Sequence, residues 1–181
     1  MPLVVLLRGI NVGKAKQVPM AELRALLAEA GYGDPRTLLR SGNAVVASDE
    51  EPDAAARRIE DLLAQRFGFP VDVVVRPAVD LDRILAADPF TGIAEDPSRQ
   101  LVAFLGGPPD ADRLRALTQL DHAPGRLVVA DRELHLWCPD GQAQSTLAKE
   151  LARAKLGTTV TVRNWRTVQK LAALAASDHS A

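Results

Sequence analysis

The chain carries the same order of secondary-structure signals twice, and this repeat limits the folds that it can adopt. Short apolar runs without helix breakers, such as residues 3–7 and 101–105, are typical of buried strands. Longer segments with apolar residues at helical spacing separate these runs. Each half predicts the order strand, helix, strand, strand, helix, strand, followed by one further helix. The two halves also end alike, because Val73-Val74-Val75-Arg76 corresponds to Val160-Thr161-Val162-Arg163.

The repeat predicts an α+β protein made of two tandem ferredoxin-like plaits, each followed by an extra helix. We expect the first plait over residues 1–90 and the second over residues 98–181, joined by a linker rich in Pro, Gly and acidic residues. The predicted strands cover residues 3–7, 37–40, 44–47, 71–75, 101–105, 127–130, 134–137 and 159–162. The predicted helices cover residues 18–30, 52–67, 81–87, 110–120, 145–156 and 165–176.

Composition and charge narrow the class of protein. The formal net charge of −1 argues against a bulk nucleic-acid binder, so an anion site would have to come from a local cluster of cations. Cys138 is the single cysteine, which excludes an intramolecular disulfide and suits a reducing cytosol. Arg8 interrupts the first apolar run, which argues against a signal peptide. No apolar run approaches the roughly 20 residues that span a bilayer. We expect a cytoplasmic protein with no membrane partner.

Two polar loops that contain glycine follow the first two predicted strands of the first half. The first strand runs into Arg8-Gly9-Ile10-Asn11-Val12-Gly13-Lys14, and the second runs into Arg40-Ser41-Gly42-Asn43. In the predicted plait the first two strands are parallel, with the third between them. Both loops therefore lie at the same edge of the sheet.

These two loops form the predicted site. Glycine-rich backbone beside fixed positive charge commonly holds phosphates and carboxylates. We expect the two arginines to bind the anion through paired hydrogen bonds, the glycine loop to add backbone N–H groups, and the two asparagines to orient the ligand. The candidate ligand-binding residues of the first half are Arg8, Gly9, Asn11, Gly13, Lys14, Arg40, Ser41 and Asn43.

The glycine loop is not a nucleotide-hydrolysing P-loop. A P-loop has four residues between its glycines, and a Ser or Thr follows its Lys to hold magnesium. Here three residues separate Gly9 from Gly13, and Ala15 follows Lys14. An alternative structural interpretation is that the two glycines only supply positive φ angles in a long connection.

A second basic segment opens the last helix. Arg163, Asn164 and Arg166 belong to it, and residues 151–176 contain no acidic residue. The structural interpretation makes Asn164 a helix N-cap and Trp165 a packing residue. The functional interpretation makes the segment a further anion-binding surface, with Arg163, Asn164 and Arg166 as ligand-binding candidates.

The sequence defines no catalytic machinery, and the question of enzymatic activity stays open. Ser145 stands where a helix cap is expected, with no base implied nearby. The histidines at 122, 135 and 179 are scattered, and His135 alternates with Leu134 and Leu136, which predicts a solvent-facing side chain. No group of ligand-type residues has metal-site spacing, so we expect no metal and no cofactor.

Five motifs are distributed over most of the chain, namely Leu6-Leu7-Arg8-Gly9-Ile10-Asn11-Val12-Gly13, Val18-Pro19-Met20-Ala21-Glu22-Leu23-Arg24, Arg40-Ser41-Gly42-Asn43, Asp88-Pro89-Phe90 and Arg163-Asn164-Trp165-Arg166-Thr167-Val168-Gln169-Lys170-Leu171. These motifs resemble those of the bacterial domain of unknown function 1697 family. The resemblance implies two tandem α/β plaits and no established activity. The sequence departs from the family pattern at Lys14, where a second glycine is frequent, and at Ser145-Thr146-Leu147, where Ser-Lys-Leu is common.

Two other functions compete with the small-anion hypothesis. Plaits include RNA-recognition modules, but these stack bases on aromatic residues of their central strands, and residues 3–7 and 44–47 contain none. A protein-interaction domain that pairs through an edge strand is the third alternative.

Overall fold

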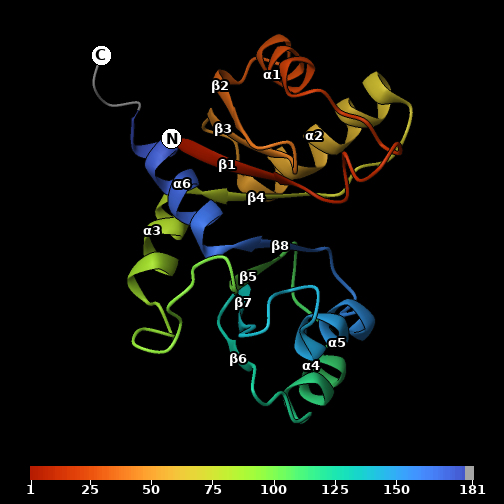
Figure 1. Ribbon diagram of the computed structural model, residues 1–181. Coiled ribbons are helices and arrows are strands. Elements are labelled where there is room, and N and C mark those ends of the chain that lie inside the picture. Colours follow the sequence, from red (N-terminus) through yellow and green to blue (C-terminus); the bar gives the residue numbers. More distant parts are fainter. Residues whose placement is uncertain (178–181) are drawn as a thin grey trace. The chain divides into compact units, whose positions relative to one another are not determined.

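The protein contains two α/β plaits of the same connectivity (Figure 1). The structure is a computed structural model in which residues 1–177 are described. Each half has the element order βαββαβ and continues into a further helix. The predicted α+β fold of two tandem plaits, each with an extra helix, is confirmed.

The first plait has a four-stranded antiparallel sheet in the order β2-β3-β1-β4. Strands β1 and β2 are parallel to each other because each pairs antiparallel with β3, which lies between them. This is the arrangement that the sequence predicted. The elements are β1 (Pro2–Leu7), α1 (Met20–Glu29), β2 (Gly33–Leu38), β3 (Asn43–Ala47), α2 (Pro52–Phe67), β4 (Val73–Pro77) and the extra helix α3 (Ala78–Ala86).

The second plait repeats this sheet order as β6-β7-β5-β8. The repeat extends to the register of the strands. Val4 of β1 lies opposite Arg76 in β4, and Val102 of β5 lies opposite Arg163 in β8. The elements are β5 (Gln100–Leu105), α4 (Ala111–Thr118), β6 (Arg126–Val129), β7 (Glu133–Trp137), α5 (Thr146–Ala154), β8 (Val160–Asn164) and the extra helix α6 (Trp165–Ala176).

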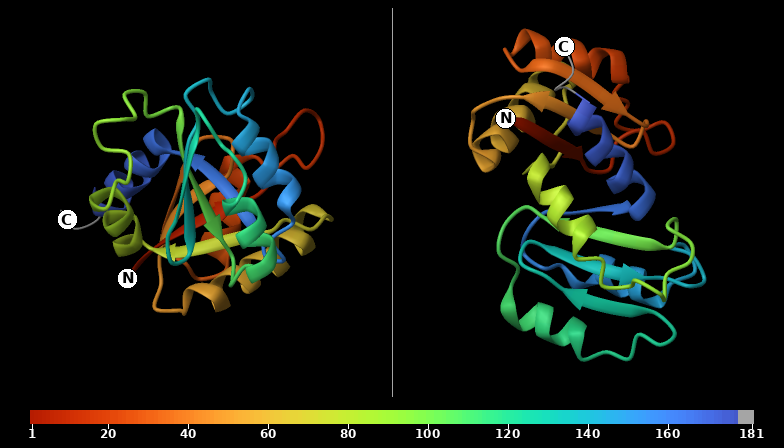
Figure 2. Two further views of the ribbon diagram at one scale, coloured as in Figure 1. Left: turned by 90° about the horizontal axis from the view of Figure 1, so that it is seen from below. Right: turned by 90° about the vertical axis from the view of Figure 1, so that its left-hand side faces the viewer.

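Two helices cover one face of each sheet (Figures 1 and 2). Because strand side chains alternate between faces, every second residue of β1 packs against α1 and α2. Leu3, Val5 and Leu7 share this core with Leu27 and Ile59 of the two helices. Leucines of β5, β7, α4 and α5 build the corresponding core of the second plait.

The chain divides into two compact units that do not follow the chain order throughout. Within the described residues, one unit contains residues 1–84 and 170–177, and the other contains residues 85–169. The predicted domains, 1–90 and 98–181, assign both sheets in the same way but keep residues 170–181 with the second plait. Contacts of the last helix explain the difference, since Arg36 of β2 donates to the Leu174 carbonyl at 2.7 Å and to Ser177 Oγ at 2.8 Å.

The second strand is the element whose predicted bounds differ most from the structure. It covers Gly33–Leu38 rather than 37–40, and its pairing with β3 shifts register between Gly33 and Arg36. Pro35 lies in the shifted segment. An edge strand tolerates proline because its outer N–H groups need no partner in the sheet.

The prediction that His135 faces solvent is wrong. Its side chain is buried, with 3% of its surface exposed. Its neighbours on the sheet face opposite α4 and α5 are also buried, among them Glu133, Thr161 and Arg163. Leu134 and Leu136 therefore lie on one face of the sheet and His135 on the other, and both faces are buried.

Candidate functional site

The two loops that follow β1 and β2 meet at one edge of the first sheet. The Asn11 side-chain amide donates to the Arg40 backbone carbonyl at 2.7 Å, and the Leu7 N–H donates to the Gly42 carbonyl at 2.8 Å. The strand order explains the meeting, because Leu6 of β1 and Leu38 of β2 both lie opposite Asn43 of β3. The structure thus brings the two loops together as the topology predicted.

Asn11 organises the first loop through its side chain. Its Oδ1 accepts from the Val18 N–H at 2.8 Å, and its Nδ2 donates to the Val18 carbonyl at 2.9 Å as well as to Arg40. Its φ of 55° lies in the left-handed region, which Asn tolerates better than most residues. Gly9 and Gly13 also have positive φ, at 66° and 61°. Asn11 therefore acts as a clamp within the protein, and its role in orienting a ligand stays a prediction.

Ser41 and Asn43 build the second loop. Asn43 is fully buried, and its Nδ2 donates to the Leu38 carbonyl at 2.8 Å and to Ser41 Oγ at 3.1 Å. Gly42 has a φ of 93° and packs so closely that an added Cβ would lie 2.8 Å from both Leu7 Cβ and Ile10 Cδ1. These contacts hold the turn against the end of β1, and a ligand contact from Ser41 or Asn43 remains a prediction.

The two loops carry four cationic residues, namely Arg8, Lys14, Lys16 and Arg40. Arg8 Nη1 lies 3.4 Å from Asp72 Oδ2, and both side chains are 54% exposed. Lys16 Nζ donates to the Pro70 carbonyl at 3.2 Å. Lys14 and Arg40 are exposed. An exposed ion pair of this length contributes little to stability, so the Arg8 guanidinium can exchange Asp72 for another anion at small cost.

The interpretation of the loops from sequence missed Asp72 as the partner of Arg8. Strand pairing could have indicated it, because β4 is antiparallel to β1 and Leu7 lies opposite Val73. The residue before β4 therefore lies beside the residue after β1. A hydrogen bond from the Arg8 N–H to the Asp72 carbonyl, at 2.9 Å, fixes this arrangement.

The candidates of the second half belong to the other compact unit and do not form a single group. Arg163 is 8% exposed, and its Nη1 donates to Thr161 Oγ1 at 2.8 Å and to the Val162 carbonyl at 2.9 Å. Burial lowers the pKa of its guanidinium to about 10. Asn164 caps α6 by accepting from the Thr167 N–H at 2.9 Å, whereas Arg166 is exposed. The N-cap role that the structural interpretation gave to Asn164 agrees with this contact, and a ligand-binding role for Arg163, Asn164 or Arg166 stays a prediction.

The remaining polar candidates form no catalytic or metal-binding arrangement in residues 1–177. Ser145 is the N-cap of α5 and accepts from the Ala148 N–H at 3.1 Å. Burial raises the pKa of the Cys138 thiol, although a hydrogen bond with Ser145 opposes this effect. The His122 ring contacts the Leu117 carbonyl at 2.7 Å, and His179 lies outside the described residues. This part of the chain has no group of three or more His, Cys, Asp or Glu residues that could hold a metal ion.

Helix length and polarity also bear on membrane insertion. None of the helices within residues 1–177 combines the length and the apolar character needed to cross a bilayer.

Comparisons with known proteins agree with the fold and assign no activity. The model of a family described as "Protein of unknown function (DUF1697)" matches residues 1–135. Among solved structures, the conserved bacterial protein SP0830 from Streptococcus pneumoniae is similar, with a TM-score of 0.80 and 22% identity over 96% of this chain and 98% of that one. No protein with a curated description matches the chain. At this identity, the structural likeness shows the fold alone.

Proposed function

This chain belongs to the DUF1697 family of proteins of unknown function, and we propose that it binds a small anionic ligand at the junction of its two polar loops. The ligand class is a metabolite that bears a phosphate or carboxylate group. The protein would act as a binding module of the bacterial cytoplasm, in keeping with its single cysteine and its lack of an extended apolar segment.

The hydrogen bond from Asn11 to the Arg40 carbonyl carries this proposal. It ties a loop that bears Arg8 and Lys14 to a loop that bears Arg40, so that cations from distant parts of the sequence share one sheet edge. A preorganised set of cations loses little conformational freedom on binding. The same residues on two independently moving loops would bind an anion more weakly.

Two kinds of group would hold the anion. Arginine presents its N–H donors in a planar fork that matches the oxygens of a carboxylate or phosphate. Backbone N–H groups next to left-handed residues form concave donor sets, and Gly9 and Gly13 provide such backbone, whereas the Asn11 N–H already donates to the Lys16 carbonyl at 3.0 Å. On binding, Arg8 would turn from the Asp72 carboxylate to the ligand. The ligand therefore competes with an internal carboxylate that is already within reach.

Thermal-shift screening followed by calorimetry tests the proposal. The probes are inorganic phosphate, citrate, nucleoside monophosphates and sugar phosphates. We expect Arg8→Ala and Arg40→Ala each to weaken the best probe by roughly tenfold, the effect of losing a charge-assisted hydrogen bond of about 1.4 kcal/mol. Arg57→Ala provides the control, because Arg57 is an exposed arginine of α2. A best probe that binds Arg8→Ala and Arg40→Ala as tightly as the unchanged protein would refute the site.

RNA binding through the sheet is a less suitable function for this plait. RNA-recognition modules use an open sheet face with aromatic residues, whereas residues 3–7 of β1 are all buried and neither β1 nor β3 has an aromatic residue. A filter-binding titration with mixed single-stranded RNA would reveal such an activity as salt-sensitive retention. We expect none.

A further inference from the structure

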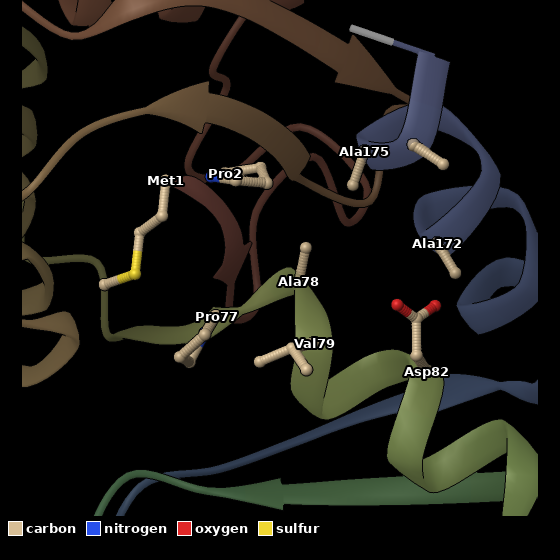
Figure 3. A pocket seen from close by; sticks show the side chains of 9 residues that line it. Met1, Pro2, Pro77, Ala78, Val79, Asp82, Ala172 and Ala175 are labelled. Atoms are coloured by element: carbon tan, nitrogen blue, oxygen red, sulfur yellow. The ribbon is translucent and has the colours of Figure 1, made fainter. Parts of the chain in front are cut away.

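The first compact unit has a hollow at the other end of β1 from the two loops. Its volume is about 360 Å³, within the range of pockets that take small molecules. Three segments that are distant in the sequence form its walls, namely the start of β1, the junction of β4 with α3, and the end of α6 (Figure 3). The lining residues used below are Pro2, Pro77, Val79, Asp82, Ala175 and Ala176.

The walls of this hollow are apolar and in part open to solvent. Alanine, proline, valine and methionine side chains make up all of the lining except Asp82. Val79 is 66% exposed and Met1 is 52% exposed. Burying such surface under an aliphatic chain is favourable, because it removes apolar area from water. The walls therefore favour a hydrocarbon ligand, since these side chains offer it no hydrogen bond.

Asp82 is the one charged side chain among the lining residues, and the α-ammonium group of Met1, which also lines the hollow, is paired with Asp49 Oδ1 at 3.1 Å. Asp82 lies on α3 one turn after Val79, and Figure 3 shows its carboxylate directed toward the space between α3 and α6, beside Ala172. A carboxylate at the edge of an apolar hollow attracts a cation and repels an anion. This preference is opposite to that of the two-loop site.

We propose that this hollow binds an aliphatic ammonium ion. The hydrocarbon chain lies between Pro2, Val79 and Ala175, and the ammonium group forms an ion pair and hydrogen bonds with the Asp82 carboxylate. Charge complementarity selects this occupant, because the walls alone would accept a neutral or anionic chain equally well. The site shares no residue with the proposed anion site.

Isothermal titration calorimetry with three probes of equal chain length tests the proposal. The probes are hexylammonium, hexanol and hexanoate. We expect hexylammonium to bind most tightly and hexanoate least tightly. Asp82→Asn is expected to lower the affinity for hexylammonium roughly fivefold, which corresponds to an exposed ion pair of about 1 kcal/mol. The affinity for hexanol should stay unchanged. The matched control is Asp61→Asn, which removes an exposed carboxylate from α2.

A second variant tests whether binding occurs in the hollow. Ala176 is exposed on α6 and lines the hollow, so Ala176→Leu is compatible with the helix and fills part of the space. We expect it to weaken all three probes. Equal binding of hexylammonium and hexanoate, or an unchanged hexylammonium affinity in Asp82→Asn, would overturn the proposal. Neither result bears on the anion site, because Asp82→Asn leaves Arg8 and Arg40 intact.

Discussion

Asn11 donates a side-chain hydrogen bond to the backbone carbonyl of Arg40 at 2.7 Å, across 29 positions of sequence. The same amide closes its own loop through two bonds with the backbone of Val18. One side chain thus sets both the shape of the first loop and its distance from the second. The geometry of the proposed anion site depends on this residue more than on any cation within it.

Asn11→Ala is expected to destabilise the protein and to weaken anion binding together. The substitution removes three hydrogen bonds and places alanine at a φ of 55°. Backbone groups that lose a partner cost about 1–3 kcal/mol, so we expect the free energy of unfolding to fall by about 2 kcal/mol. Urea denaturation measures this change. Lys14→Ala, an exposed substitution in the same loop, should stay within about 0.5 kcal/mol, and equal effects of the two substitutions would contradict the clamp role of Asn11.

Substituting two glycines of the loops distinguishes the stability cost of backbone strain from that of steric overlap. Gly13→Ala places a Cβ in open space at a φ of 61°, so it should cost only the strain of the left-handed conformation, about 1 kcal/mol. Gly42→Ala adds an overlap with Leu7 and Ile10, where the new Cβ would lie at 2.8 Å, and should cost about 3 kcal/mol. Urea denaturation of both variants gives the comparison. Similar values would show that the turn relaxes away from β1.

Local patterns in the sequence were sufficient to predict much of this fold. The helices α2 (Pro52–Phe67) and α6 (Trp165–Ala176) have the bounds that apolar spacing predicted. The meeting of the two loops also followed from sequence, because the strand order of a plait determines which strand ends are neighbours. Both results rest on short-range periodicity combined with one topological rule.

The features that sequence could not predict depend on tertiary neighbours. Asp34 and Pro35 disfavour a strand, yet the edge position in the sheet tolerates them in β2. His135 alternates like a solvated residue but lies in a second buried face. The ion pair of Arg8 with Asp72 involves segments that are far apart in the sequence, and so does the hollow beside Asp82. No local sequence pattern predicts either feature.

Arg163 and Arg166 offer a direct test of the structural interpretation of the last helix. Arg163→Ala would leave the buried Thr161 Oγ1 and the partly buried Val162 carbonyl without this donor, so we expect a loss of about 3 kcal/mol in the free energy of unfolding. Arg166→Ala, at an exposed position, should change it by less than about 0.5 kcal/mol. Calorimetry with the best anionic probe completes the test. A loss of anion affinity in Arg166→Ala would instead support a binding role for this segment.

The raised pKa of Tyr32 predicts that the free energy of unfolding falls at high pH. Burial, followed by the hydrogen bond that its hydroxyl donates to Glu50 Oε2 at 2.8 Å, raises the pKa of Tyr32 from 10.0 to about 12. Below pH 10 the phenol is neutral in both the folded and the unfolded chain, and its favourable environment contributes fully to stability. Between pH 10 and 12 the unfolded chain releases the proton while the folded chain retains it, so stability falls as the pH rises.

The single tyrosine of the chain makes this prediction directly measurable. Phenolate absorbance in the near ultraviolet should show half-ionisation near pH 12 in the folded protein and near pH 10 in urea. Urea denaturation across the same pH range should show the loss of stability, and Tyr32→Phe should remove this component of the pH dependence while losing the hydrogen bond to Glu50. Half-ionisation of the folded protein near pH 10 would mean that Tyr32 is solvated, and that the contact with Glu50 does not persist in solution.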